Sequence, residues 1–236
     1  MAASSAATAP DTSIALTSGG RTARIGPPSP VPLSASSKTA AFAALRESML
    51  ACGRCPKLVE SRSRVVPGDG AVPAEVAFVG LAPGRFGGDR TGIPFDADRS
   101  GELLRRMIKH AGLRGVFITN VVRCNPRDLR GRNRDPDASE IANCRSHLTA
   151  ELAMVNPRIV VCLGRIAWNA LAGRENPFEP QRPKVIEVHG SRLLPLYHPA
   201  YVIRGAYAER SYRRHFVWLA RMLREIVSAH LPNPND

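Results

Sequence analysis

Long apolar stretches and phosphate-binding glycine patterns are both missing from this sequence. No apolar run is long enough to span a bilayer, and the first residues lack the basic start and continuous apolar block of a secretory signal. Neither GxxxxGK followed by Ser or Thr, nor a GxGxxG leading directly from a strand into a helix, occurs in the chain. These absences argue against a membrane protein, an exported protein and a glycine-rich cradle for a nucleotide cofactor.

Acidic residues are scarce relative to basic ones. The 236 residues include 33 Lys and Arg but only 20 Asp and Glu, so the formal net charge at pH 7 is +13. Arginines occur in nearly every segment rather than in one tail, so the folded body itself is expected to be positive. The expected partner is therefore a polyanion, nucleic acid above all.

Composition divides the chain into a low-complexity leader and one folded domain. Residues 1–38 are rich in Ala, Ser, Thr and Pro and are predicted to form a disordered leader. The domain is expected to cover residues 39–236 and to act as a monomer. The predicted strands are 75–83, 115–124, 158–164 and 191–199. The predicted helices are 100–112, 136–155 (with Ser139 as a candidate cap), 165–173 and 209–230.

Strands that alternate with helices favour an α/β fold, in which helices cover both faces of a parallel sheet. Ligands of such folds bind beyond the carboxyl ends of the strands. Three predicted strands end there in polar, distinctive sequence: GLAPGRFGG from Gly80, TNVVRCNP from Thr119 and YHPAY from Tyr197. We therefore expect these three strand ends to converge on one site.

The side chains at these strand ends suit a flat, polar, uncharged ligand such as a nucleobase. Phe95 offers a ring for stacking, and acidic side chains, Asp98 among them, flank it. Asn120 carries both a donor and an acceptor and can read a pyrimidine edge. His198 precedes Pro199, which stiffens the backbone and presents the imidazole firmly. The plain alternatives are an asparagine that only forms a turn and a structural histidine.

Four of the five cysteines form a metal-binding pattern. Cys52 and Cys55 are a CxxC pair, and Cys124 and Cys144 lie downstream, about twenty residues apart. Four thiolates in this arrangement can hold a tetrahedral zinc ion or a [4Fe–4S] cluster, and the spacing does not separate the two. Cys162 lies inside an apolar strand and is expected to be a buried core residue.

Three ordered motifs, together with these cysteines, resemble the iron–sulfur uracil-DNA glycosylases, families 4 and 5 of the uracil-DNA glycosylase superfamily. The motifs are GLAPGRFGGDRTGIPFDADRSGELL, then ITNVVRCNP with NRDP and EIANC, then YHPAYVIR. The resemblance runs from about Cys52 to the final helix. It implies a three-layer α/β/α sandwich with a central four-stranded parallel sheet. It also implies a monofunctional DNA-repair enzyme of the bacterial cytoplasm or nucleoid that hydrolyses the bond to uracil and leaves an abasic site.

The resemblance further implies how the base is bound and released. His198 would donate a hydrogen bond to the oxyanion that develops at uracil O2, since stabilising the departing base does most of the catalytic work. Phe95 would stack on the base, and Asn120 would read its edge. Backbone groups would complete the pocket at Ala82, Pro83 and Gly84. The four cysteines would be the ligands of a structural [4Fe–4S] cluster.

Some motif positions distinguish the two families. Leu81 stands where family 4 proteins usually carry Glu, so the chain is family 5-like, although GIPF and HPAYVIR resemble family 4. Family 5 members accept deaminated purines, so DNA containing hypoxanthine is a further expected partner. Asp98 of the DRSG motif is the candidate for activating water, with main-chain groups or Asp89 as the fallback. The alternative for Asp98 is that it only caps the following helix.

The segment after His198 mixes apolar and basic residues, as expected for contact with a duplex from which a base is flipped. Tyr201, Val202 and Ile203 would wedge into the duplex, although a plain solvated loop is the alternative. The predicted phosphate contacts are Arg204, Arg210 and Arg213. A second basic loop, 126–136, is expected near DNA as well.

A rival interpretation is a non-catalytic or covalently trapping uracil-DNA-binding protein of the same fold. Trapping relatives carry a basic loop that ends in an additional nucleophilic histidine. Here the loop RDLRGRNRDP has the arginines but no histidine, which favours turnover. A nucleotide-dependent DNA-binding protein that uses zinc is a third alternative.

Overall fold

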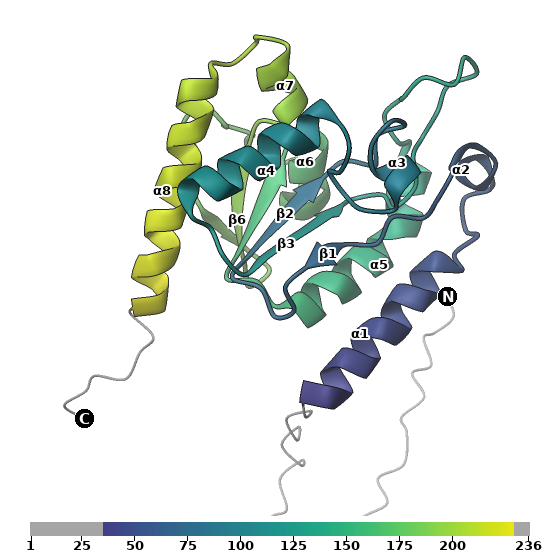
Figure 1. Cartoon of the computed structure of the whole chain (residues 1–236), viewed down its shortest axis with the longest axis horizontal. Helices are drawn as coiled ribbons and strands as arrows, with labels where there is room; N and C mark the ends of the chain where they lie inside the picture. The colour runs from purple at the N-terminus through teal and green to yellow at the C-terminus, as the bar shows by residue number, and fades with distance from the viewer. Residues whose placement is uncertain (1–34, 229–236) are drawn as a thin grey trace, which may run out of the picture. The chain divides into compact units, whose positions relative to one another are not determined.

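The computed structural model describes residues 35–228, and their centre is one six-stranded sheet with the order β1-β3-β2-β4-β6-β5 (Figure 1). The four inner strands are parallel, as predicted: β3 (Val116–Asn120), β2 (Val76–Gly80), β4 (Ile159–Leu163) and β6 (Ser191–Leu196). The sequence did not predict the antiparallel edge strands, β1 (Asp69–Gly70) and β5 (Ile186–Val188). The predicted leader lies outside the described residues as far as Ser34. Helix α1 (Ala35–Leu50) begins before the predicted domain start at Thr39.

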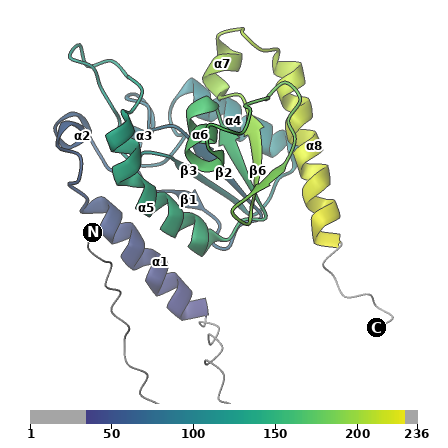
Figure 2. The same cartoon turned by 180° about the vertical axis from the view of Figure 1, so that it is seen from behind.

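Helices cover both faces of the sheet, as Figures 1 and 2 show from opposite sides. On one face, α4 (Arg99–Ala111) packs against α8 (Glu209–Ser228); α5 (Ala138–Val155) and α6 (Arg165–Ala172) cover the other, and α1 packs against α5. The short helices are α2 (Pro56–Ser61), α3 (Gly88–Thr91) and α7 (Pro199–Ile203). The predicted three-layer sandwich is confirmed. Among the described helices, none has the length and apolarity required to cross a membrane.

Burial on both faces explains the apolar composition of the inner strands. All residues of β2 and β4 are buried, and Cys162 is fully buried in β4 as predicted. Side chains alternate between the layers: Phe78 stacks on Phe216 of α8 at 5.7 Å, whereas Val79 belongs to the cluster around Trp168 of α6. Each such side chain contributes about 1.5–3 kcal/mol when fully buried. Alternate residues of one strand therefore pack against different helix layers, and both faces of the inner strands are apolar.

Helices α4 and α5 begin at side-chain caps. Asp98 Oδ1 accepts a hydrogen bond from Gly101 N at 2.8 Å at the start of α4. At the start of α5, Asp137 and Glu140 form a reciprocal capping box. Asp137 is therefore the N-cap rather than Ser139, whose hydroxyl donates to Asp137 Oδ1 at 2.6 Å.

A buried ion pair joins the segment after β3 to α5. Arg123 Nη2 lies 2.5 Å from Glu151 Oε2, and each side chain is 1% exposed. The Glu151 carboxylate also accepts from Thr119 Oγ1 at 2.6 Å and from Gly68 N at 2.7 Å. Arg123 Nη1 donates to Asn120 O at 2.5 Å. Removing one partner of such a pair costs about 3–5 kcal/mol, so the network fixes the carboxyl end of β3.

Candidate active site

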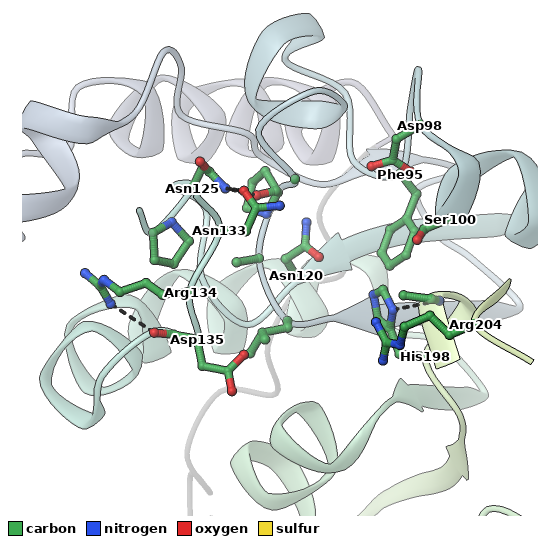
Figure 3. A pocket seen from close by; sticks show the side chains of 16 residues that line it. Phe95, Asp98, Ser100, Asn120, Asn125, Asn133, Arg134, Asp135, His198 and Arg204 are labelled. Atoms are coloured by element: carbon green, nitrogen blue, oxygen red, sulfur yellow. Dashed lines mark hydrogen bonds between the residues drawn. The ribbon is translucent and has the colours of Figure 1, made fainter. Parts of the chain in front are cut away.

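The carboxyl ends of β2 and β3 and the start of α7 border one cavity of about 540 Å³ (Figure 3). The three strand ends therefore meet at one place, as the sequence pattern predicts. Eight of the predicted site residues line this cavity: Ala82, Pro83, Gly84, Phe95, Asp98, Asn120, His198 and Arg204.

Phe95 and His198 lie side by side in the cavity wall. Their ring centroids are 5.5 Å apart and the rings are tilted by 37°. Gly80, the last residue of β2, provides the space for this arrangement. A Cβ atom on Gly80 would lie 2.5 Å from Phe95 Cε2 and 2.6 Å from Asn120 Oδ1. A glycine is required here because any side chain would displace the ring and the amide.

Asn120 brings an unpaired amide to the cavity. The residue is 1% exposed, and neither Oδ1 nor Nδ2 makes a hydrogen bond within the described part of the chain. Buried polar groups are nearly always paired, and leaving one unpaired costs about 1–3 kcal/mol. Figure 3 shows the amide between the Phe95–His198 pair and the Asn125–Asn133 pair. One donor and one acceptor are thus available to a ligand whose edge offers the complementary pair.

His198 presents a neutral hydrogen-bond donor. It is the N-cap of α7, and its Nδ1 accepts from Ala200 N at 3.2 Å. Burial, with the nearby positive charge of Arg204, lowers the pKa of His198 to about 4. At neutral pH the ring is therefore uncharged, and its single proton is on Nε2 because Nδ1 is an acceptor.

The loop that carries Phe95 is strained and held in place by α4. The backbone φ is +52° at Phe95 and +55° at Ala97, a region that residues other than glycine rarely adopt. Arg105 Nε donates to Phe95 O at 3.0 Å, and its Nη2 donates to Pro94 O at 3.1 Å. A Cβ on Gly101 would overlap Phe95 O. The ring position is therefore set before a ligand arrives.

Asp98 both caps α4 and borders the cavity. The cap engages Oδ1, whereas Oδ2 lies near the loop after β2 (residues 81–87, the first loop), 3.0 Å from where a Cβ on Gly84 would stand. Asp89, the fallback candidate, is fully buried and pairs with Arg127, and its Oδ1 accepts from Ser63 N at 3.0 Å. Because Asp89 does not line the cavity, it is a structural residue, and the part of the fallback that named Asp89 was wrong.

Besides Ser100 of α4, four polar residues line the cavity although no individual role was predicted for them: Asn125, Asn133, Arg134 and Asp135. They belong to the basic loop 126–136 and its edge, which folds back onto the first loop. Asn125 Nδ2 donates to Pro83 O at 2.6 Å and to Asn133 Oδ1 at 2.9 Å, and Asn133 Oδ1 also accepts from Arg85 N at 3.1 Å. The NRDP motif was the signal available for finding them.

The four predicted cysteine ligands border a separate small cavity: Cys52, Cys55, Cys124 and Cys144. They come from the α1–α2 connection, the segment after β3, and α5. Nitrogen donors surround the sulfur atoms: Arg54 Nε lies 3.4 Å from Cys52 Sγ and Arg62 Nη1 lies 3.2 Å from Cys124 Sγ. Within residues 35–228, no three His, Cys, Asp or Glu side chains form a group that would hold a metal ion.

Comparison with known proteins decides the family. Residues 67–220 match the family described as the uracil DNA glycosylase superfamily. The chain belongs to this superfamily. It is 34% identical over 178 residues to the type-4 uracil-DNA glycosylase of Archaeoglobus fulgidus, covering 71% of this chain and 86% of the relative. It is 36% identical over 183 residues to the type-5 uracil-DNA glycosylase of Pyrobaculum aerophilum, covering 63% of this chain and 78% of the relative. Both types are thus among its relatives.

In this member of the uracil-DNA glycosylase superfamily, α7 differs from the predicted wedge. Val202 is 6% exposed and belongs to the core, and Ile203 packs against the same cluster, so neither is free to enter a duplex. The helix turns both side chains inward. Tyr201 is 36% exposed and stacks on Tyr197, with centroids 4.5 Å apart. The three predicted phosphate contacts are all exposed: Arg204, Arg210 and Arg213.

Proposed function

We propose that this protein is a monofunctional DNA glycosylase that excises uracil from DNA and leaves an abasic site for base excision repair. The observation that carries the proposal is the amide of Asn120, which has no partner among the described residues and is buried beside Phe95 and His198 at one cavity. Uracil presents a donor, N3–H, next to an acceptor, O4, which complements that amide. Relatives of both types carry the name uracil-DNA glycosylase.

Cleavage of the N-glycosidic bond leaves negative charge on the departing uracil. The neutral Nε2–H of His198 donates to O2, where this charge develops, and acts as a fixed dipole that needs no reorganisation. Phe95 holds the base plane, and its strained loop keeps the ring in position. Backbone groups from Ala82 to Gly84 complete the pocket.

Asp98 positions the attacking water in this mechanism. Its cap to Gly101 N occupies Oδ1 only, so Oδ2 is left to accept a hydrogen bond from water at the cavity margin. The capping interpretation and the catalytic one are therefore compatible, because the cap fixes the orientation of the carboxylate.

The substrate is DNA, bound by a monomer with an excess of positive charge. Arg204 borders the cavity, and Arg210 and Arg213 are exposed nearby in sequence, so all three are assigned to phosphates. A cavity of about 540 Å³ also admits a purine, which supports breadth toward hypoxanthine.

The four cysteines bordering the small cavity are assigned to a [4Fe–4S] cluster. Besides the two arginine donors, Asn143 Nδ2 lies 3.5 Å from Cys55 Sγ, and Arg123 N lies 3.4 Å from Cys144 Sγ. Such N–H groups stabilise thiolate-bound clusters. When bound, the cluster would clip the α1–α2 connection to α5, as structural support.

Cys144→Ser is expected to abolish the bound iron and the brown colour and to lower the melting temperature, because one of four ligands is lost. The matched control is Cys162→Ala, which changes a buried cysteine outside the cavity and should keep the iron. Iron and acid-labile sulfide per chain are measured in both proteins. A colourless wild-type protein with stoichiometric zinc would contradict the assignment.

The reaction is tested on an oligonucleotide with one uracil. Free uracil and strands that break only after alkali are expected, with several turnovers per protein molecule. An adduct stable to denaturant would indicate trapping, and binding without release would indicate a non-catalytic protein; either outcome overturns the proposal. The same assay with hypoxanthine, xanthine and thymine mispairs defines the substrate range.

A further inference from the structure

A second cavity of about 370 Å³ adjoins the proposed active site, and most of its lining takes no part in the mechanism above. His198 and Arg204 line both cavities. The remaining wall comes from the start of α6, from Tyr201 of α7 and from the segment around Phe178. A ligand covalently joined to an occupant of the first cavity can therefore reach the second by passing these two side chains.

Aromatic rings form one wall of this second cavity. Tyr201 stacks on Tyr197, with centroids 4.5 Å apart and an interplanar angle of 11°, and Phe178 meets Tyr197 edge-on at 6.3 Å. Tyr207 packs on Tyr197 at 4.7 Å, and its hydroxyl lies 2.8 Å from His215 Nε2. The rings are thus anchored to α8 and present a preformed stacking platform, with Tyr201 at its exposed end.

Positive charge accompanies the rings. Arg165 Cζ lies 5.1 Å from the centroid of the Phe178 ring, and both Arg165 and Arg204 are exposed. Aromatic faces beside a cationic track are the combination by which proteins bind unpaired nucleotides, since every base has a face to stack and every linkage carries a phosphate. Packing of the 174–184 segment alone would not require exposed guanidinium groups beside the rings.

We propose that the second cavity binds the nucleobase adjacent, on the same strand, to the base that is excised. The inference rests on the proposed glycosylase function. Arg204 borders both cavities and is the counter-charge for the phosphate that joins the two nucleotides, while Tyr201 and Phe178 contact the neighbouring base. Occupying both cavities separates two adjacent bases from each other. The enzyme therefore prefers uracil in single-stranded or locally unpaired DNA, where this separation costs least.

The test is a cycle of two protein variants and two substrates. The variants are Tyr201→Ala and Phe178→Ala. The first substrate is a single-stranded oligonucleotide in which both neighbours of uracil are intact nucleotides. In the second substrate, a baseless tetrahydrofuran residue replaces one neighbour, on the 5′ side in one version and on the 3′ side in the other. On the intact strand each variant is expected to lower kcat/KM about 10-fold or more, through KM. When the baseless residue is on the side that the second cavity binds, the kcat/KM of the wild type should fall by the same factor. The kcat/KM of the variants should not fall further on that substrate.

Val217→Ala, which truncates an exposed apolar side chain on α8, is the matched control and should behave as wild type on both substrates. Losses that are the same with and without the neighbouring base would mean that the rings only support the fold, and would overturn the inference. A wild-type protein that releases no uracil from any strand would instead refute the glycosylase function itself. The two failures are therefore distinguishable.

Discussion

Replacing His198 with alanine is expected to lower kcat for uracil release about 10²- to 10³-fold, the usual loss when one donor to a developing oxyanion is removed. The donor is the neutral Nε2–H, whose position is fixed by the bond from Ala200 N to Nδ1.

Because the pKa of His198 is about 4, its ring stays neutral above that value. Protonation of this residue will therefore not slow the wild-type enzyme between about pH 7 and pH 5.5, where an ordinary histidine titrates. Single-turnover release of uracil measures both effects.

His198→Asn separates the chemical role from the structural one. Asparagine is a favourable N-cap, so α7 keeps its cap, but the shorter side chain does not reach the position of Nε2. Both variants should be equally slow, whereas His198→Asn should unfold at the temperature of wild type. A rate within about threefold of wild type in either variant would contradict the assignment of the donor.

Replacing Asn120 with alanine is expected to lower kcat/KM about 10²-fold or more without lowering the free energy of unfolding. A site built to hydrogen-bond its substrate loses heavily when one of those groups is removed. In the free protein, however, the same amide is buried with no partner among the described residues, so its removal relieves a cost of about 1–3 kcal/mol. Loss of activity with unchanged or higher stability identifies a group kept for its ligand.

Thr119→Val is the matched control on the preceding residue of β3. Thr119 is equally buried, but its hydroxyl donates to Glu151 Oε2 at 2.6 Å. That variant should lose about 1 kcal/mol of unfolding free energy and little activity. Denaturant unfolding of both variants provides the comparison. If Asn120→Ala is the less stable of the two, the amide has a structural role and the pocket assignment is wrong.

The sequence predicted the inner sheet and the central pocket residues for a physical reason. Apolar runs of β length alternating with helices define a parallel sheet, and the carboxyl ends of parallel strands necessarily lie at one edge. Asn120 ends β3 and His198 follows β6 by two residues, so topology brings both to this edge of the sheet. Phe95 lies in the long loop after β2, and its position also depends on the bonds from Arg105 of α4. The edge strands β1 and β5 were not predictable, because two or three residues carry no period.

Other residues depend on contacts that no local pattern encodes. Asn125 and Asn133 reach the cavity because they bond to the first loop, more than forty residues away in sequence. The sequence pattern predicts that Val202 is exposed and wedges into DNA, but helix α7 directs its side chain into the core. Asp89 is acidic and close to the motif, yet its pairing with Arg127 takes it out of the cavity. In each case a long-range contact decided which way the side chain faces.

The buried pair of Arg123 and Glu151 sets a lower limit on how small a working version of this enzyme can be made. The stretch shared with the wider superfamily, residues 67–220, looks like a natural fragment to express. Cutting there would remove Val66, whose amide donates to Arg123 O at 2.8 Å, along with Met49 and Leu58, which pack over the same region. Water would then reach the buried ion pair of Arg123 and Glu151, which is now shielded from solvent. Arg123 also donates a hydrogen bond to the carbonyl of Asn120. Truncation from the amino-terminal side would thus weaken the support that holds Asn120 in the pocket, although every residue that lines the pocket would still be present.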